Sequence, residues 1–497
     1  MRFAPFFSTY VHSHDQTCRA GAGRRGPSSY HGGCGWGATL SGLVATILLC
    51  WSATGALAQQ IDLRPQLAEG VRTVTVEWQL AGELRLPAPT DGLRPAPTPK
   101  VGATGRLTYD ETPLPTAAPP SASEVPARFV RLYREVETSI GVDSNVRQQT
   151  VRPERHLTLT SSTTTGPQIL AIDGPLRREE LDTLRLPADS LSLAGLLPNE
   201  PLEIGATWHH TPETIASLTM LQTVEICECQ SVLAEANSRY AKCQMGGTIH
   251  GTIDGTRTEM DLDAVYLVDL ERGEITQFNL AIREHREVGP ITPGLEGIVK
   301  LRVAIAPTDR EHLTPELVDR VVTSYPVPAT AVETWNSELG FLTTHDASWH
   351  TTGSRGRSMS LRKISPAGLV AHATLTRLPP KELVPEVSLA EFRADVARAI
   401  GEPMAGIASD ESFTNQHGCR VLYVVAQGAV DGVPVEWHAY QVAPPAEQPD
   451  GHRLALTFVI ESDRLEELAG QDRQLVERIE LLPEPAETAA SKRQPLK

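Results

Sequence analysis

Basic residues and aromatic residues are both scarce in this chain. Lysine and arginine together number 45 against 61 aspartates and glutamates, and aromatic residues make up 5% of the 497 positions. An acidic chain without a basic tract is unsuited to nucleic acids and to anionic membrane surfaces, because both bind through clustered Lys and Arg. Since 40% of the residues are apolar, the chain can still build a core.

Sequence signatures of catalysis are also missing. The chain contains no G-x-S-x-G elbow, no H-E-x-x-H helix and no Walker loop. Acidic pairs such as Asp261 with Asp263 are expected by composition alone. We therefore expect no catalytic residue, no cofactor, no metal site and no enzymatic activity.

Four histidines are the residues on which an alternative hypothesis, that the protein is an enzyme, would depend. His209 and His210 are adjacent and on a strand would point to opposite faces, and His345 and His350 flank Trp349. The simplest interpretation places all four at the surface or in solvated loops. A cluster of His209, His345 or His350 with carboxylates in one cleft would revive the enzyme hypothesis.

Cysteines are too few for a disulfide-dense scaffold. Three of the seven precede residue 58, and the other four are Cys227, Cys229, Cys243 and Cys419. A hairpin turn centred on Ala236 would place Cys229 opposite Cys243, so these two form a possible disulfide. The alternative is that all four are small buried residues.

An export signal is present near the N-terminus. The uncharged, mostly apolar run 38–51 follows Arg24 and Arg25 and precedes Ala56-Leu57-Ala58, which is the order of a signal peptide with cleavage after Ala58. We expect residues 1–58 to be the signal peptide of a secreted or periplasmic protein. The alternative is a retained anchor, because roughly 17 apolar residues are at the lower limit for spanning a bilayer.

Residues 59–306 are predicted to form an antiparallel β domain. Apolar and polar residues alternate over 72–86, 128–159 and most of 222–306, and Asp254-Gly255 is typical of a hairpin turn. Between these runs lies a Pro-rich insert over 87–126, which we expect to be extended and mobile, with at most a short strand over 105–110.

A second domain is predicted over 331–482. The preceding segment 307–330 is a linker with a short capped helix over 314–322, and residues 483–497 form a disordered tail. Within the domain, Ser388-Leu-Ala-Glu391 is a capping box that opens a helix. Several strand-like runs surround it.

The second domain resembles the PsbP-like fold, an α/β sandwich in which helices cover an antiparallel sheet. The resemblance lies in the order of elements, carried by Gly340-Phe341, Trp349, Ser388–Phe392, Arg420–Val425, Val435–Tyr440, Arg453–Phe458 and a last helix ending at Ile479. It implies a non-catalytic binding or assembly module.

The first domain resembles a group of exported bacterial proteins of unknown function. The matching pieces are Pro175–Leu181, Leu196–Pro198, Ile204–Trp208 and the Gly-rich run from Gly247. Its long one-sided strands are also similar in pattern to the lipoprotein-carrier (LolA-like) half-barrel.

Together these features predict an α+β protein, with a curved antiparallel sheet domain followed by a PsbP-like sandwich. We expect a non-catalytic binding or assembly module of the cell envelope, whose partner is an unknown envelope protein. The alternative is a carrier of a lipid or other apolar ligand in the N-terminal half-barrel. Membrane contact is expected only if the signal segment is retained. An open apolar pocket on the order of several hundred Å³ would favour the carrier, and a filled core would oppose it.

Overall fold

The computed structural model describes residues 60–66, 70–87, 97–114, 128–163, 166–308, 312–324, 331–378, 387–445 and 451–483. The predicted signal segment with Ala58 and the predicted disordered tail from 484 onward lie outside the described residues. The structure is mostly β, with large antiparallel sheets. Among the described residues, no helix is both long and apolar enough to span a membrane.

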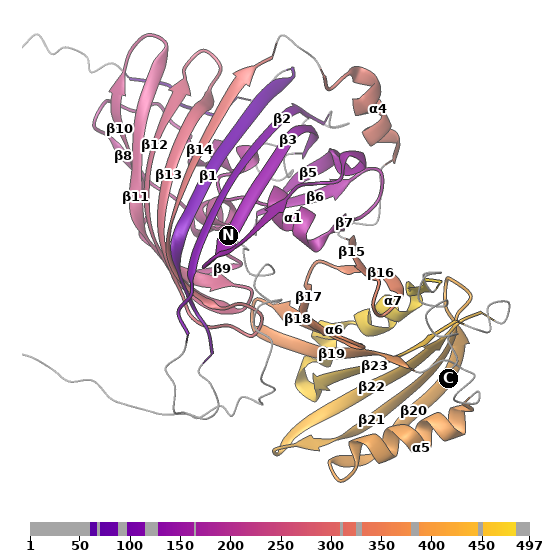
Figure 1. Cartoon of the computed structure of the whole chain (residues 1–497). Coiled ribbons are helices and arrows are strands. Elements are labelled where there is room, and N and C mark those ends of the chain that lie inside the picture. Colours follow the sequence, from indigo (N-terminus) through magenta and orange to yellow (C-terminus); the bar gives the residue numbers. More distant parts are fainter. Residues whose placement is uncertain are drawn as a thin grey trace, which may run out of the picture.

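The N-terminal part is built on one 13-stranded sheet with the order β6-β5-β3-β2-β1-β14-β13-β12-β11-β10-β8, with β4 added beside β3 and β9 beside β11 (Figure 1). Its strands are β1 (Arg72–Arg85), β2 (Lys100–Pro113), β3 (Arg128–Val142), β4 (Asn145–Gln149), β5 (Leu157–Thr163), β6 (Gly166–Ala171), β8 (Thr207–His209), β9 (Thr223–Cys227), β10 (Gln230–Ala236), β11 (Tyr240–Ile253), β12 (Thr256–Asp269), β13 (Glu274–Arg286) and β14 (Gly294–Pro307).

Each long strand of this sheet has one buried and one wet side, as the alternation predicts. In β12, Met260, Leu262 and Ala264 are buried while Asp261 and Asp263 are exposed. We call the buried side the apolar face of the sheet and the other side the polar face. Burial of each large apolar side chain contributes about 1.5–3 kcal/mol, so the apolar face determines the register of the strands.

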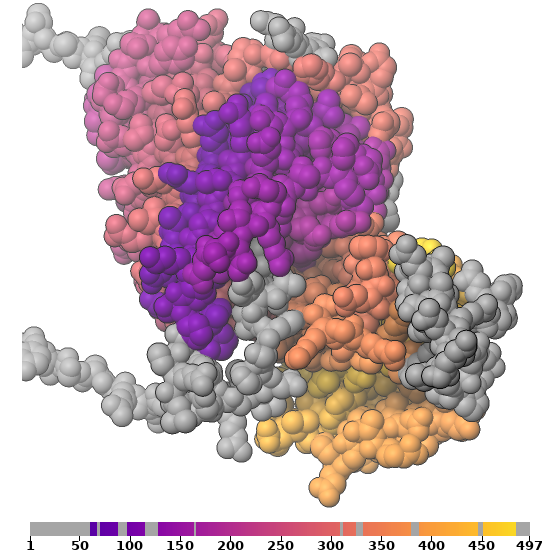
Figure 2. Space-filling view, in the orientation of Figure 1, coloured from indigo at the N-terminus to yellow at the C-terminus, as the bar shows by residue number. Residues whose placement is uncertain are grey.

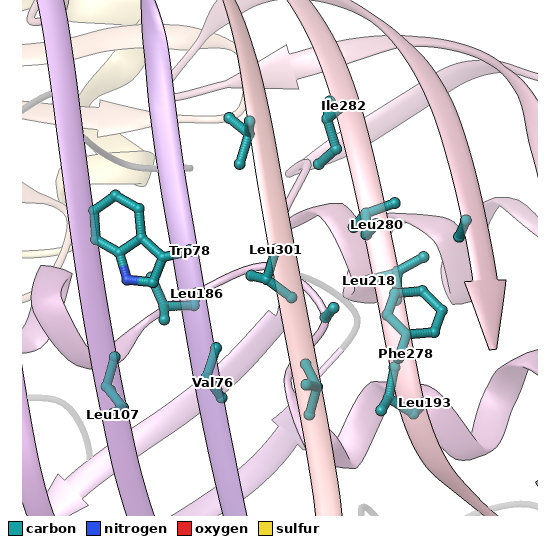
Figure 3. Close-up of a cluster of buried hydrophobic side chains, with 14 of the residues drawn as sticks. Val76, Trp78, Leu107, Leu186, Leu193, Leu218, Phe278, Leu280, Ile282 and Leu301 are labelled. Atoms are coloured by element: carbon teal, nitrogen blue, oxygen red, sulfur yellow. The ribbon is translucent and has the colours of Figure 1, made fainter. Parts of the chain in front are cut away.

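Three short helices cover the apolar face. They are α1 (Arg178–Leu184), α2 (Ser190–Leu193) and α3 (Pro212–Thr219), and the Thr211 hydroxyl caps α3 by accepting from the backbone N–H of Thr214. Figure 3 shows Leu186, Leu193 and Leu218 of this segment beside side chains from the strands. The apolar face is therefore a filled core.

A buried ion network fastens this helical segment to the sheet. Arg131 of β3 has no solvent exposure and donates to both carboxylate oxygens of Asp189, each at 2.7 Å. Its Nε donates to Glu111 of β2 at 2.9 Å, and Glu111 also accepts from Arg72 of β1 at 2.9 Å. Asp189 in turn caps α2 through the backbone N–H of Leu191. The guanidinium of Arg131 thus connects two central strands to the start of a helix.

The Pro-rich segment differs from the prediction, because its middle is a central strand. β2 covers Lys100–Pro113 and pairs with both β1 and β3. The ten prolines of 87–126 lie at positions 87–99 and 113–126, so residues 100–112 contain none and can donate to both neighbours. Residues 88–96 and 115–127 lie outside the described residues.

The hairpin that carries the cysteines also has a different register from the predicted one. β10 and β11 pair so that Cys243 lies opposite Leu233, not opposite Cys229. Both cysteines are buried, and both thiols are free in the structure. The register on which the predicted disulfide depended is therefore wrong, because β10 starts only after Cys229 and the turn falls beyond Ala236.

The C-terminal part contains two smaller sheets. A 4-stranded sheet has the order β24 (Glu480–Leu481), β16 (Phe341–Asp346), β15 (Ala331–Asn336) and β7 (Leu176–Arg177), and a 7-stranded sheet has the order β17 (Trp349–Arg355), β18 (Ser358–Ser365), β19 (Gly368–Leu378), β23 (Arg453–Glu461), β22 (Val433–Ala443), β21 (Arg420–Val430) and β20 (Met404–Thr414). The predicted linker helix is confirmed as α4 (Pro315–Ser324).

Helices pack on both sides of the 7-stranded sheet. The predicted helix after Ser388 is confirmed as α5 (Leu389–Ile400), and its Phe392 and Val396 pack on one face of the sheet (Figure 1). On the other face lie α6 (Leu465–Leu468) and α7 (Gln471–Glu477). The predicted single last helix is broken because Ala469 and Gly470 both adopt left-handed backbone conformations.

Strand pairing and arginine contacts join the two parts of the chain. β7 belongs to the N-terminal part by sequence, yet it pairs in parallel with β15. Arg178 of α1 donates to the carbonyl oxygens of Ala347 and Trp349, and Arg152 bonds to both Glu180 and Glu333. Figure 2 shows the indigo-to-salmon and orange-to-yellow atoms as adjoining regions.

The passage of the chain beside Gly247 gives a stability prediction. A Cβ at Gly247 would lie 2.1 Å from the carbonyl oxygen of Glu228 and 2.7 Å from Cα of Cys229, so backbone would have to move. We expect Gly247→Ala to lower the free energy of unfolding by about 1–3 kcal/mol, measured by urea denaturation. Gly406→Ala, at a strand position with open space, is the control, and an equal effect of both changes would contradict this account.

Candidate ligand groove

One large groove lies on the polar face of the 13-stranded sheet. It has a volume of about 1280 Å³, and its walls are two neighbouring rows of side chains that run across the strands. The first row is Glu137, Arg106, Glu77, Arg302, Asn279, Val265, Gln244, Val232 and Thr207, and the second is Gln148, Ser139, Thr104, Gln79, Lys300, Ala281, Asp263, Gly246 and Gln230. Each member is the registered partner of the next.

The length of the groove follows from strand spacing. Each row crosses nine strands, which at about 4.8 Å per strand gives a contour of roughly 38 Å. A volume of about 1280 Å³ distributed along this length corresponds to a narrow groove. It suits an extended molecule better than a compact one.

Charge is distributed unevenly along the groove. On β2, Arg106 donates to Glu77 and to Glu135, each at 3.2 Å, so its charge is balanced. Lys300 and Arg302 on β14 form no ion pair within the part of the chain that the structure describes. The middle of the groove therefore carries two exposed cations.

The floor of the groove is backbone and small residues. Trp78 is the single aromatic residue among those that line the groove. Its ring lies on the opposite face, where it covers Gly105: a Cβ there would be 2.3 Å from the indole Nε1. No aromatic ring among the lining residues therefore faces a ligand.

A buried polar cluster lies on the apolar face behind one end of the groove. Tyr266 donates to the Ser231 hydroxyl at 2.9 Å, and that hydroxyl lies 2.7 Å from Nε2 of His210. Burial, with His209 adding to it, lowers the pKa of His210 to about 4, so the ring is neutral at pH 7. The prediction that His210 lies at the surface is wrong. Its side chain points to the side opposite that of the exposed His209 and is buried.

The three histidines of the enzyme hypothesis lie on three different sheets. His209 is exposed on β8, His345 is on β16 and His350 is on β17. The prediction of solvated loops is wrong for His345 and His350, which are both buried in strands. Nε2 of His345 lies 2.7 Å from the Thr334 hydroxyl, and burial lowers the pKa of His345 to about 4. Within the described ranges, no three His, Cys, Asp or Glu residues gather in a possible metal site.

A second titratable cluster, missed by the sequence argument, lies between β22 and α7. Nδ1 of His438 lies 2.6 Å from a carboxylate oxygen of Asp472, and Nε2 lies 3.2 Å from Glu436. Tyr440 donates to the same oxygen of Asp472 at 2.7 Å. The shared face of His438 and Tyr440 follows from strand periodicity, but Asp472 is far away in sequence, and no local pattern indicates it.

These contacts set opposite pKa shifts. Burial opposes the charge of His438, but the bonds to Asp472 and Glu436 outweigh burial and raise its pKa. Burial also opposes the charge of Asp472, but the bond to His438 outweighs it and lowers that pKa. Tyr423, whose pKa burial raises to about 12, and the Arg473 guanidinium complete the surroundings. At pH values below this raised pKa, the His438 ring is an imidazolium between two carboxylates, and its bond to Asp472 joins α7 to the sheet.

Comparisons with known proteins find structural similarity only. No protein-family model matches the chain, and no curated protein matches it. A protein of Bacteroides thetaiotaomicron is 8% identical over 31% of this chain and 48% of its own, with a TM-score of 0.21. Lipovitellin is 10% identical over 50% of this chain and 26% of its own, with a TM-score of 0.25.

The outer membrane protein OprD of Pseudomonas aeruginosa is 8% identical over 78% of this chain and 92% of its own, with a TM-score of 0.11. The chain thus spans about half of the first of these proteins and about a quarter of the second. TM-scores this low assign neither a fold nor a function to this chain.

The His438 cluster gives a pH prediction. Because the pKa of His438 is raised in the folded protein, protonation of this ring stabilises the fold. The stabilisation is complete at pH values below 6.5, the ordinary histidine pKa, and is lost as the pH rises through the raised pKa of the folded protein. Because the pKa of Asp472 is lowered in the folded protein, its ionised carboxylate stabilises the fold. This stabilisation is complete at pH values above 3.8, the ordinary aspartate pKa, and is lost as the pH falls through the lowered pKa. We expect His438→Gln to lower the free energy of unfolding more at pH 6 than at pH 9, measured by urea denaturation.

His209→Gln, on exposed β8, is the matched control for this measurement and should leave stability nearly unchanged at both pH values. An effect of His438→Gln that is the same at pH 6 and pH 9 would show that the ring is not held as an imidazolium.

Proposed function

We propose that this chain is an exported, non-catalytic binding protein that carries an extended ligand in the groove across its 13-stranded sheet. The observation that supports this most strongly is the pair of continuous side-chain rows. All eighteen residues of the two rows border one groove of about 1280 Å³. Pockets for compact small molecules are on the order of 300–1,000 Å³, so this space favours a longer ligand.

The carrier interpretation places its ligand on the polar face rather than in the apolar interior. The apolar face is occupied by α1–α3 and the segments beside them, which leaves the groove as the large open space on this sheet. The proposal that the protein works in the periplasm or outside the cell comes from the signal segment over 1–58. A role in envelope assembly, with a partner protein, is compatible with the same groove.

Native mass spectrometry of the mature protein, purified from its own cell envelope, tests this function. We expect a bound mass on the wild-type protein. Ala281→Trp should remove it, because Ala281 is in the second row and a large ring there would fill the groove. Ala304→Trp lies on the same face of β14 outside the rows and should keep it.

Loss of the bound mass in both tryptophan variants, or retention in both, would contradict a ligand in the groove. Absence of any bound mass from the wild-type protein would contradict the carrier function. Thermal unfolding of the variants shows whether each is folded.

A further inference from the structure

We infer that the groove takes a long amphipathic ligand, with an anionic group at Lys300 and Arg302 and its hydrocarbon chain across β13, β12, β11 and β10. This inference rests on the proposed function and adds the chemical class and the orientation of the ligand.

The anionic group is indicated by the two unpaired cations. In register, Arg302 lies between Glu77 and Asn279, and Lys300 lies between Gln79 and Ala281. The nearest acid in the first row, Glu77, is already bonded to Arg106 at 3.2 Å. Lys and Arg bind carboxylate, phosphate and sulfate groups through charge-assisted hydrogen bonds, and here two of them stand side by side on one strand.

The direction of the hydrocarbon chain follows from what lies on either side of β14. Towards β10 the two rows carry Val265, Val232, Ala281 and Gly246 together with the uncharged polar residues Asn279, Gln244, Gln230 and Thr207. Asp263 is the one charged row member on this side of β14. Val265 is 38% exposed. An apolar chain that covers Val265 would remove this surface from water.

The opposite end of the groove is unsuited to hydrocarbon. Towards β3 the first row carries Glu77, Arg106 and Glu137, and the second carries Thr104 and Ser139. Covering charges with an apolar chain costs their hydration without providing new partners. A chain that starts at Lys300 therefore gains by lying across the four strands towards β10, a contour of roughly 19 Å.

Binding of cis-parinarate, a fluorescent long-chain carboxylate, tests this inference against its uncharged methyl ester. We expect the wild-type protein to bind the carboxylate at least tenfold more tightly than the ester. The double change Lys300→Gln with Arg302→Gln should abolish that preference by lowering the affinity for the carboxylate to that for the ester. Val265→Asp should weaken both probes.

The matched control is Lys100→Gln with Arg85→Gln, which removes two exposed cations outside the rows and should change neither affinity. Equal binding of the two probes to the wild-type protein, or loss of carboxylate binding in the control, would overturn the anionic site. Binding that survives Val265→Asp would overturn the orientation.

Failure of this inference is distinguishable from failure of the proposed function. If neither probe binds but the native bound mass is still lost in Ala281→Trp, the carrier function stands and the amphipathic class is wrong. If the probes bind equally well to Ala281→Trp, they occupy another place, and the assigned site is wrong.

Discussion

The fully buried guanidinium of Arg131 is the contact on which the arrangement of the N-terminal part depends. Removing such a charge from water costs several kcal/mol unless all its donors find partners. Here Arg131 donates two hydrogen bonds to Asp189, one to Glu111 and one to the Ser190 hydroxyl. Because Asp189 starts α2 while Glu111 and Arg131 are on β2 and β3, the helical segment is held against the apolar face. Loss of either carboxylate would leave an uncompensated charge in the core.

Closure of the apolar face determines where a ligand can bind. Leu193 and Leu218 fill space over the strands on the apolar face, whereas the groove lies on the polar face. On the polar face, the antiparallel register places side chains that point to the same side of neighbouring strands next to one another. One residue from each strand therefore contributes to one continuous wall. Residues as far apart in sequence as Gln79 and Lys300 become neighbours in this way. The groove is thus a consequence of the same pairing that builds the core.

Local chemistry is what the sequence could reveal. The alternation in β12 and the Ser388 capping box each depend on a few adjacent residues, and both are confirmed. Of β2, the sequence predicts at most a strand over 105–110, because the ten prolines of 87–126 disfavour a longer one, although residues 100–112 contain none. The secreted location, the PsbP-like class and the absence of enzymatic activity stay predictions.

Contacts between residues that are far apart in the sequence could not be predicted from the sequence alone. The bonds of Asp472 to His438 and of Arg131 to Asp189 join residues on elements whose packing no local pattern specifies. The candidate groove could not be predicted for the same reason. Its two rows form only through the pairing register of ten strands, which in sheet order are β4, β3, β2, β1, β14, β13, β12, β11, β10 and β8. The long one-sided strands predict a ligand in an open apolar pocket of the half-barrel, but in the structure the apolar face is filled.

The most direct measurement of the central claim is photocrosslinking of a long-chain fatty acid that carries a diazirine on its chain, followed by peptide mapping. Binding in the groove predicts labels on the polar-face residues of β12, β11 and β13, such as Val265, Gln244 and Ala281. Labels on Leu193, Leu218 or Phe278, which belong to the core on the apolar face, would contradict the account.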